Sequence, residues 1–158
     1  MLNSYLNLDE IDSKILQLLQ QDASLTNVKL AEKIGLSAAA TLARVRKLEQ
    51  DELIDSYSIR VNHEKLRFGL LFFVSVQLSS HDVELVDKFR VAIRELAEVI
   101  ECHFVTGGSD YLLKVAVKDR AALEDFLVRK LTPIPGVDRM QTSLVLNEVK
   151  KGTVLPVG

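Results

Sequence analysis

A short basic segment without acidic residues is the first feature of this sequence that could do chemistry. From Ser37 to Leu48 the chain carries Arg44, Arg46 and Lys47 and no Asp or Glu. Residues 1–60 as a whole hold seven basic and nine acidic residues, so the positive charge is concentrated locally. Such a segment can contact DNA phosphates. Taken alone, the three basic residues are equally compatible with an ordinary solvated helix face.

A glycine-rich turn from Thr106 to Asp110 is the second candidate site. Gly107 and Gly108 leave backbone groups accessible, and Asp110 adds a carboxylate. Backbone amides can hold a ligand carboxylate while Asp110 pairs with an ammonium, so this turn could bind an α-amino acid. The alternative is a plain hairpin loop, for which the same residue types are common. The residues alone favour the hairpin loop.

The sequence contains no arrangement typical of an enzyme or of a metal site. Its three histidines fall in separate predicted elements. Cys102 and His103 are neighbours on a predicted strand, so they point to opposite faces and cannot share a metal. Cys102 alternates with Ile100 and Phe104 and is expected in the core. His103 and Glu101 share the other face, where a metal, a polar ligand or a hydrogen bond between subunits could engage them. We predict a protein that is not an enzyme, with no catalytic residue, no metal and no cofactor.

Helical periodicity up to about residue 56 predicts three helices that position the basic segment. Asp9, Thr26 and Ser37 stand where N-caps belong, and Gly35 stands where a helix ends. Only three residues, 35–37, separate the second helix from the third. So short a connection makes the two axes cross sharply, as in a helix-turn-helix.

The third helix is expected to turn Leu42, Val45 and Leu48 inward. Its opposite face then consists of small side chains with Lys47, and Arg44 and Arg46 lie at the flanks. Small residues allow a close approach to the groove, so selectivity would come largely from DNA shape. Packing against another helix is the competing explanation for the alanines. The residues expected at the DNA surface are Ser37, Ala39, Ala40, Thr41, Ala43, Arg44, Arg46 and Lys47.

Beyond Ser56 the pattern predicts the order β-α-β-β-α-β of a ferredoxin-like domain. The expected strands are 70–78, 100–106, 111–117 and 137–149, and the helices begin at Asp82 and Asp119. Both helices would cover one face of a single antiparallel sheet. The other face would be bare and would be covered most simply by a second copy of the chain. The fold class is therefore α+β.

Length and composition are consistent with two small soluble domains. The chain has 158 residues, a net charge of −2, 47% hydrophobic residues and one Cys. These values exclude a disulfide scaffold and a generally basic surface. The N-terminus does not resemble a signal peptide, and the longest apolar run, 70–74, is far too short to cross a membrane. We expect a cytoplasmic protein with domains 1–56 and 70–158, joined by a hinge at 57–69.

The combined pattern resembles the Lrp/AsnC family, the leucine-responsive or feast/famine transcription regulators. The resemblance covers nearly the whole chain and rests on the order and spacing of seven segments. These are Leu8–Leu16, Leu30–Ser37, Arg44–Glu49, Glu101–His103, Val105–Gly107, Asp110–Lys114 and Pro135–Val137.

The resemblance implies an N-terminal winged helix-turn-helix that binds double-stranded DNA, a hinge strand near 57–62 and a C-terminal ferredoxin-like domain. That domain pairs into homodimers, which commonly assemble further into octamers. A small effector, usually an amino acid, lies between dimers near the turn. The implied effector residues are Thr106, Gly107, Gly108, Ser109, Asp110 and Tyr111. Two positions depart from the family: Glu52 replaces the glycine usual before the wing, and Ala38 replaces a frequent proline.

Our leading hypothesis is a nucleoid-associated transcription regulator whose assembly or DNA affinity responds to an amino acid. The alternative is an amino-acid-binding oligomer that senses without binding DNA. The alanine face and the acidic net charge keep this alternative open.

Overall fold

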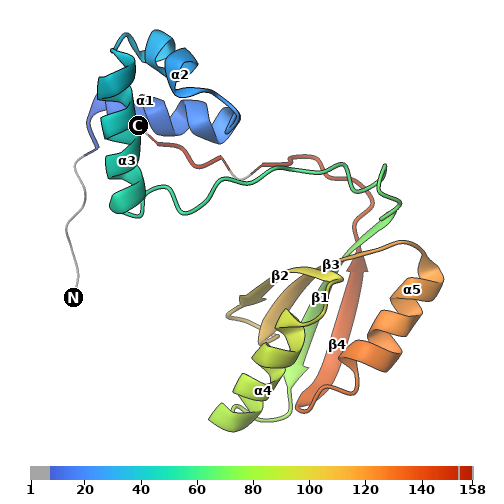
Figure 1. The fold of residues 1–158 in the computed structure, drawn as a ribbon. Coiled ribbons are helices and arrows are strands. Elements are labelled where there is room, and N and C mark those ends of the chain that lie inside the picture. The colour runs from blue at the N-terminus through green and yellow to red at the C-terminus, as the bar shows by residue number, and fades with distance from the viewer. Residues whose placement is uncertain (1–7, 153, 158) are drawn as a thin grey trace. The chain divides into compact units, whose positions relative to one another are not determined.

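The computed structural model describes residues 8–152 and 154–157 and divides the chain into two compact units (Figure 1). The first unit contains the chain up to residue 60 together with the residues from 150 onward, and the second unit spans 61–149. The boundaries expected from the sequence differ from this division. They place the residues after 149 in the C-terminal domain, whereas in the structure these residues group with the helix-turn-helix unit.

The first unit contains three helices, α1 (Glu10–Gln21), α2 (Asn27–Ile34) and α3 (Ala38–Gln50). The predicted N-caps are confirmed, because the side chains of Asp9, Thr26 and Ser37 each accept a hydrogen bond from the N–H three residues later. Gly35 ends α2 with φ +75°, the left-handed conformation that glycine tolerates. Asn27 Nδ2 donates to the Ala38 carbonyl at 2.7 Å, which joins the first turns of α2 and α3.

Of the three residues of α3 expected to point inward, Val45 and Leu48 do so, and Thr41 takes the place expected for Leu42. Thr41 and Leu48 are buried, whereas Leu42 is 38% exposed. Thr41 can be buried because its Oγ1 donates to the Ser37 carbonyl at 3.0 Å, so no polar group is left unsatisfied. The prediction that Leu42 points inward was therefore wrong.

Residues 51–69 form turns and irregular backbone. The hinge strand expected at 57–62 and a strand-containing wing are absent from this fully described segment. Glu52 has φ +56°, and it stands at the position where the family usually has glycine. A side chain in this left-handed region is strained against its own backbone.

We expect Glu52→Gly to stabilise the first unit by about 1 kcal/mol, because glycine removes the left-handed strain. Glu52→Ala, which removes the carboxylate but keeps Cβ, should give no such gain. Arg67→Gly is the matched control, because Arg67 has φ +64° and lies in the second unit. The same relief of backbone strain should stabilise the second unit and leave the first unchanged. Denaturant unfolding followed separately in the two units measures all three variants. Equal stabilisation by Ala and Gly at position 52 would show that charge, and not backbone strain, is responsible.

The second unit has the predicted ferredoxin-like order. Its elements are β1 (Leu70–Leu78), α4 (Val83–Arg94), β2 (Val99–Phe104), β3 (Tyr111–Val117), α5 (Arg120–Asp125), the π-helical continuation η1 (Phe126–Leu131) and β4 (Val137–Leu144). The strands form one antiparallel sheet in the order β2-β3-β1-β4. Helices α4 and α5 lie on the same face of this sheet (Figure 1).

The core of the second unit lies between this sheet face and the helices. Phe89 of α4 and Phe126 of η1 are fully buried against alternate residues of β1 and β3, among them Val74 and Leu113. Gly136 precedes β4 with φ +92°, and a Cβ there would collide with the Leu85 side chain. Only glycine fits this close approach between the start of β4 and α4.

Candidate DNA-binding and effector sites

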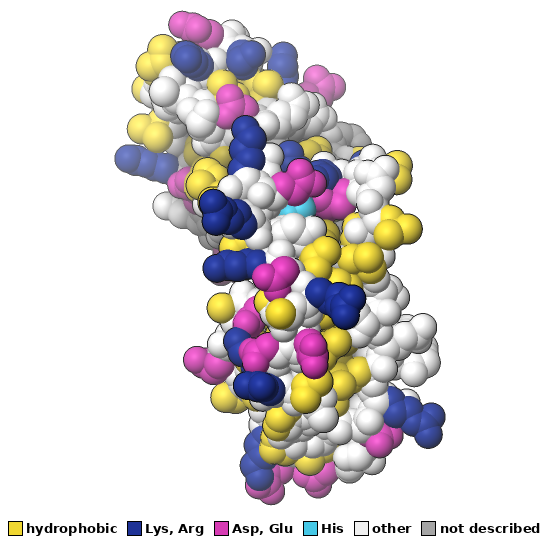
Figure 2. Space-filling view, turned by 90° about the vertical axis from the view of Figure 1, so that its right-hand side faces the viewer, with side chains coloured by type: hydrophobic (Ala, Val, Ile, Leu, Met, Phe, Trp, Pro, Cys, Tyr) yellow, Lys and Arg dark blue, Asp and Glu magenta, His cyan; other side chains and the backbone are white. Residues whose placement is uncertain are grey.

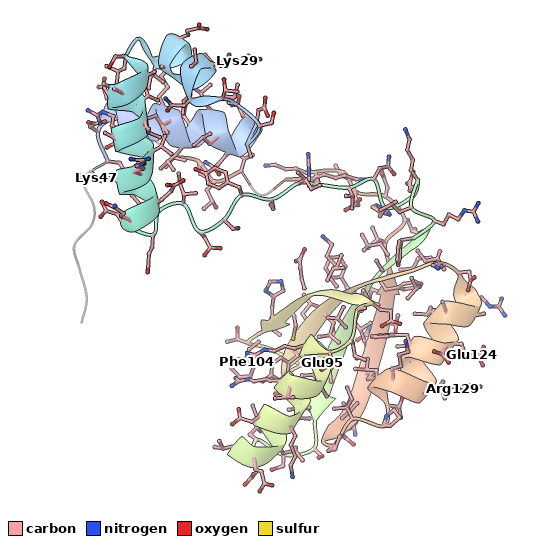
Figure 3. The ribbon with its side chains drawn as sticks, in the orientation of Figure 1. Lys29, Lys47, Glu95, Phe104, Glu124 and Arg129 are labelled. Atoms are coloured by element: carbon pink, nitrogen blue, oxygen red, sulfur yellow. The ribbon has the colours of Figure 1, made fainter. Side chains whose placement is uncertain are left out.

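The exposed surface of α3 consists of small side chains flanked by two cations. Ala39, Ala40 and Ala43 are exposed, and so are Arg46 and Lys47. Lys47 projects from α3 and Lys29 from α2 in Figure 3. A surface of methyl groups can approach a DNA groove closely, and the cations beside it can contact phosphates.

Three of the residues expected at the DNA surface make structural contacts within the first unit. Thr41 is fully buried, so its side chain cannot reach DNA. Arg44 Nη1 donates to Asp9 Oδ2 at 2.6 Å and to Asp12 Oδ1 at 2.7 Å, which joins α3 to the start of α1. Hydrogen bonds to these carboxylates raise the pKa of Arg44, which stays charged, and the two ion pairs offset its positive charge. Ser37 is exposed, but its hydroxyl oxygen accepts from the Ala40 N–H as the cap of α3.

The predicted turn connects β2 to β3 and is anchored at both ends. The Val105 N–H donates to the Asp110 carbonyl at 2.9 Å, and the Asp110 N–H donates to the Val76 carbonyl at 2.9 Å. Thr106, Gly107 and Gly108 are exposed, and Gly107 has φ +122°. The confirmed hairpin therefore presents accessible backbone at its tip. Ser109, like Asp110, is half-buried.

The Asp110 carboxylate is held in place by two neighbours. Its Oδ2 accepts from the Leu78 N–H at 2.7 Å, and its Oδ1 lies 2.7 Å from His81 Nε2. Hydrogen bonding to His81 and then to the Leu78 N–H lowers the pKa of Asp110. A carboxyl with a lowered pKa stabilises the fold above its ordinary value and loses that contribution as the pH falls through the lowered value. Asp110 is therefore an oriented, ionised carboxylate at neutral pH.

Sequence reasoning missed His81, because it lies 29 residues from Asp110 and outside any periodic pattern. The pairing of β1 with β3 brings the two together: Val76 lies opposite Tyr111, and His81 follows the end of β1. A sequence-based search that compared the ends of paired strands could have found this contact.

Tyr111, which the resemblance places among the effector residues, is a core residue in this structure. Its ring is 2% exposed and lies 4.7 Å from the Phe89 ring and 5.2 Å from the Phe104 ring, centroid to centroid. Its hydroxyl oxygen accepts from Arg90 Nε at 3.0 Å. The Tyr111 side chain therefore packs beneath the turn. The part of the turn that a ligand can reach is the exposed backbone of residues 106–108.

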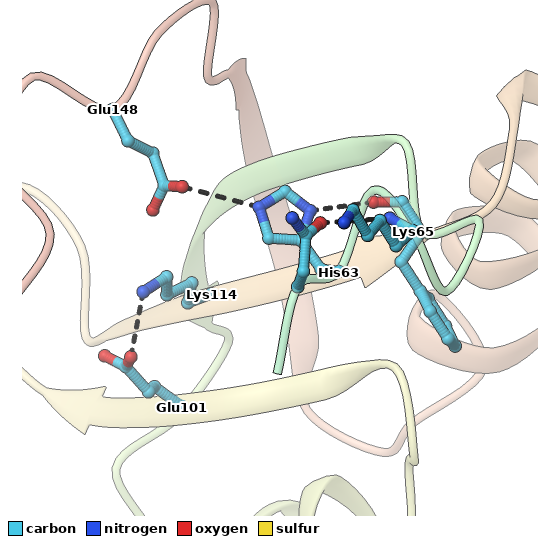
Figure 4. Close-up of polar contacts among 7 residues, drawn as sticks. His63, Lys65, Glu101, Lys114 and Glu148 are labelled. Atoms are coloured by element: carbon cyan, nitrogen blue, oxygen red, sulfur yellow. Dashed lines mark hydrogen bonds and ion pairs between the residues drawn. The ribbon is translucent and has the colours of Figure 1, made fainter. Parts of the chain in front are cut away.

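The sheet face turned away from the helices, which we call the open face, is polar at one edge. Glu101 Oε1 accepts from Lys114 Nζ at 3.0 Å, as Figure 4 shows, and Glu101 Oε2 lies 3.2 Å from His103 Nε2. His103 and then Lys114 lower the pKa of Glu101. The Glu101–His103 pair expected from the sequence is therefore present, with Lys114 as a third member.

Apolar residues are exposed elsewhere on the second unit, whose hydrophobic side chains appear in the lower half of Figure 2. Phe73, which pairs with Lys114 on the open face, is 37% exposed. Cys102 is also exposed, although the sequence favoured the core. The reason is that β2 is an edge strand, and only one neighbouring strand lies beside Cys102.

A helix-turn-helix with exposed cations, joined to a ferredoxin-like unit with an ionised, oriented carboxylate in a glycine turn, defines a two-domain DNA-binding regulator. The family model for the AsnC-type helix-turn-helix domain matches residues 8–49, and that for the Lrp/AsnC ligand binding domain matches residues 71–155. The chain belongs to the Lrp/AsnC family of transcription regulators. The match to the helix-turn-helix model argues against a sensor without direct DNA binding.

Relatives of known name and structure agree with this assignment. The leucine-responsive regulatory protein of Escherichia coli K12 is 38% identical over 151 residues, covering 96% of this chain and 92% of that protein. A Neisseria meningitidis transcriptional regulator solved as a complex with L-Met is 36% identical, with a TM-score of 0.91 and coverage of 94% and 96%. An AsnC family regulator from Agrobacterium tumefaciens is 33% identical, with a TM-score of 0.87 and the same coverage.

Within the part of the chain that the structure describes, no helix is long and apolar enough to cross a membrane.

Proposed function

We propose that this regulator binds double-stranded DNA through the exposed face of α3 and responds to a free amino acid bound at the turn 106–110. It acts by binding and not by catalysis, on the nucleoid DNA of the cytoplasm. The observation that carries the effector assignment is the oriented, ionised carboxylate of Asp110 beside the exposed backbone of Gly107 and Gly108. These groups are complementary to the two charged ends of an α-amino acid.

The expected binding mode follows from these charges. The effector carboxylate would accept from backbone N–H groups of the turn, and its ammonium would pair with Asp110. His81 already lies against Asp110 Oδ1, so the ammonium must compete with the imidazole for that oxygen. Selectivity for the effector side chain must come from residues beyond the turn, supplied by a neighbouring subunit. The complex of the Neisseria regulator with L-Met supports an amino acid as the ligand class.

The direct test measures DNA affinity at several salt concentrations, with and without each of the twenty amino acids. We expect affinity to fall as salt rises, as it does for proteins that contact phosphates. At least one amino acid should change either DNA affinity or assembly. A protein that binds amino acids but shows no salt-dependent DNA affinity would overturn the DNA half of the proposal.

We propose that the open face pairs two chains into a dimer and that dimers assemble further, up to an octamer. The support is an uncovered antiparallel sheet whose helices both lie on the other side, with Phe73 exposed on it. Burying such a face between two copies removes apolar surface from water.

Phe73→Glu is expected to weaken the dimer at least about 100-fold, because it places an unpaired carboxylate in the interface. Val128→Glu is the matched control: Val128 is also exposed but lies on η1, away from the open face. Sedimentation velocity at micromolar concentration separates monomer from dimer. If the two variants sediment alike as dimers, the open face is not the dimer interface.

A further inference from the structure

Residues near the end of the chain bind to α1 of the helix-turn-helix unit. The side-chain amide of Gln20 pairs with the backbone of Leu155: its Oε1 accepts from the Leu155 N–H at 2.7 Å, and its Nε2 donates to the Leu155 carbonyl at 3.3 Å. Gln17, one turn earlier on α1, donates from Nε2 to the Val157 carbonyl. Two glutamines spaced three residues apart on a helix lie on one face. Both can therefore form hydrogen bonds with the backbone of one extended peptide.

The same segment completes the apolar core of the first unit. Val157 is partly buried and packs against the cluster formed by Ile15, Leu16, Leu30 and Leu48. A cavity of about 820 Å³ lies beside it, lined by residues of α1, by residues 53–58 and by Lys151, Gly152, Val154, Leu155 and Val157. The Leu155 side chain, in contrast, is 72% exposed. Recognition therefore uses the backbone of Leu155 and the side chain of Val157.

We propose that the helix-turn-helix unit carries a receptor groove for an extended apolar peptide, formed by Gln17, Gln20 and the apolar cluster, and that residues 154–157 of this same chain are its occupant. The two glutamines form hydrogen bonds with the peptide backbone, and the apolar cluster packs against the side chain of Val157. Pro156 restricts the segment to an extended conformation before it binds, which lowers the entropic cost of docking. Docking completes the core that holds α1 against α3, so full DNA affinity requires it.

The experiment compares the full chain with a version that ends at residue 149. We expect amide hydrogen exchange in α1 to accelerate and DNA affinity to fall, each about tenfold, in the shortened chain. A synthetic peptide of residues 150–158, added in excess, should restore both. A peptide carrying Leu155→Ala should restore them equally, whereas one carrying Val157→Asp should not.

Point variants of the full chain keep the proposal testable if the shortened chain does not fold. Gln17→Ala combined with Gln20→Ala should accelerate exchange in α1, while Lys14→Ala, at an exposed residue of the same helix that does not line this cavity, should not. Exchange at the wild-type rate in the double variant would overturn the receptor groove. Faster exchange with unchanged DNA affinity would overturn the claim that docking is needed for DNA binding.

Discussion

Replacing Arg46 and Lys47 by alanine is expected to weaken DNA binding at least about 100-fold, because each substitution removes a charge-assisted interaction worth roughly 1.5–3 kcal/mol. These are the two exposed cations of α3. Removing one phosphate-binding cation should also reduce the slope of log K against log salt by about 0.9. The weakening should be similar for specific and random DNA, since phosphates carry no sequence information. Fluorescence anisotropy over a salt series measures both quantities.

Arg94→Ala combined with Arg129→Ala is the matched control, since both arginines are exposed and lie in the second unit. This variant has the same change in net charge and should leave the slope unchanged. An Arg46/Lys47 variant that is folded and assembled yet keeps the wild-type slope would show that α3 does not bind the DNA backbone.

Arg44→Ala should behave differently from the variants at Arg46 and Lys47. Its guanidinium is occupied by Asp9 and Asp12, so its removal should destabilise the packing of α1 on α3 without changing the salt slope of the folded protein. Thermal unfolding and the salt series together distinguish the two roles. A reduced slope with unchanged stability would make Arg44 a phosphate-binding residue, as the sequence alone indicates.

Asp110→Asn is expected to weaken effector binding at least about 30-fold, because the ammonium of the amino acid no longer has a charged partner. Asparagine keeps an oxygen that can accept from the Leu78 N–H, so the turn should retain its shape. The variant therefore separates ligand pairing from turn formation, which Asp110→Ala would not do. Calorimetric titration of the folded variant with a panel of amino acids measures the effect.

His81→Ala is the informative companion, because it removes the other partner of the same carboxylate. If the ammonium competes with His81, this variant should bind the effector as well as wild type or more tightly. Because the site is completed by another subunit, binding and assembly are reciprocally coupled. Asp110→Asn should therefore also abolish the change in assembly that the effector produces. Wild-type effector affinity in Asp110→Asn would remove Asp110 from the site.

Local rules were sufficient to predict the helices and the four strands of the sheet, although the strand expected at 57–62 is absent. Asp9, Thr26, Ser37 and Asp119 all cap the helices that they were expected to cap, because a cap depends only on residues within one turn. The order of strands and helices along the second unit followed from the alternation of apolar residues together with the short hairpin turn. Tyr111 belongs to the same alternation as Leu113 and Val115, and that pattern already indicates a place in the core.

Contacts between residues distant in sequence are what the sequence did not indicate. Arg44 belongs to the basic segment in sequence because the acids lie elsewhere along the chain, yet Asp9 and Asp12 lie against it in space. Thr41 was expected at the surface, but its bond to the Ser37 carbonyl allows burial. The contact of Gln20 with Leu155 spans 135 residues, a separation that no periodicity reports.

The first unit combines residues from the two ends of the described chain, which has a consequence for the order in which the units can be completed during synthesis. The ribosome produces the three helices of the first unit, then all of residues 61–149, and only afterwards the residues from 150 that rejoin the first unit. Domains generally fold as units while the chain is still emerging. The ligand-binding domain can therefore fold before the DNA-binding unit receives its last segment. A nascent chain can complete its helix-turn-helix unit only after residues 61–149 have been made.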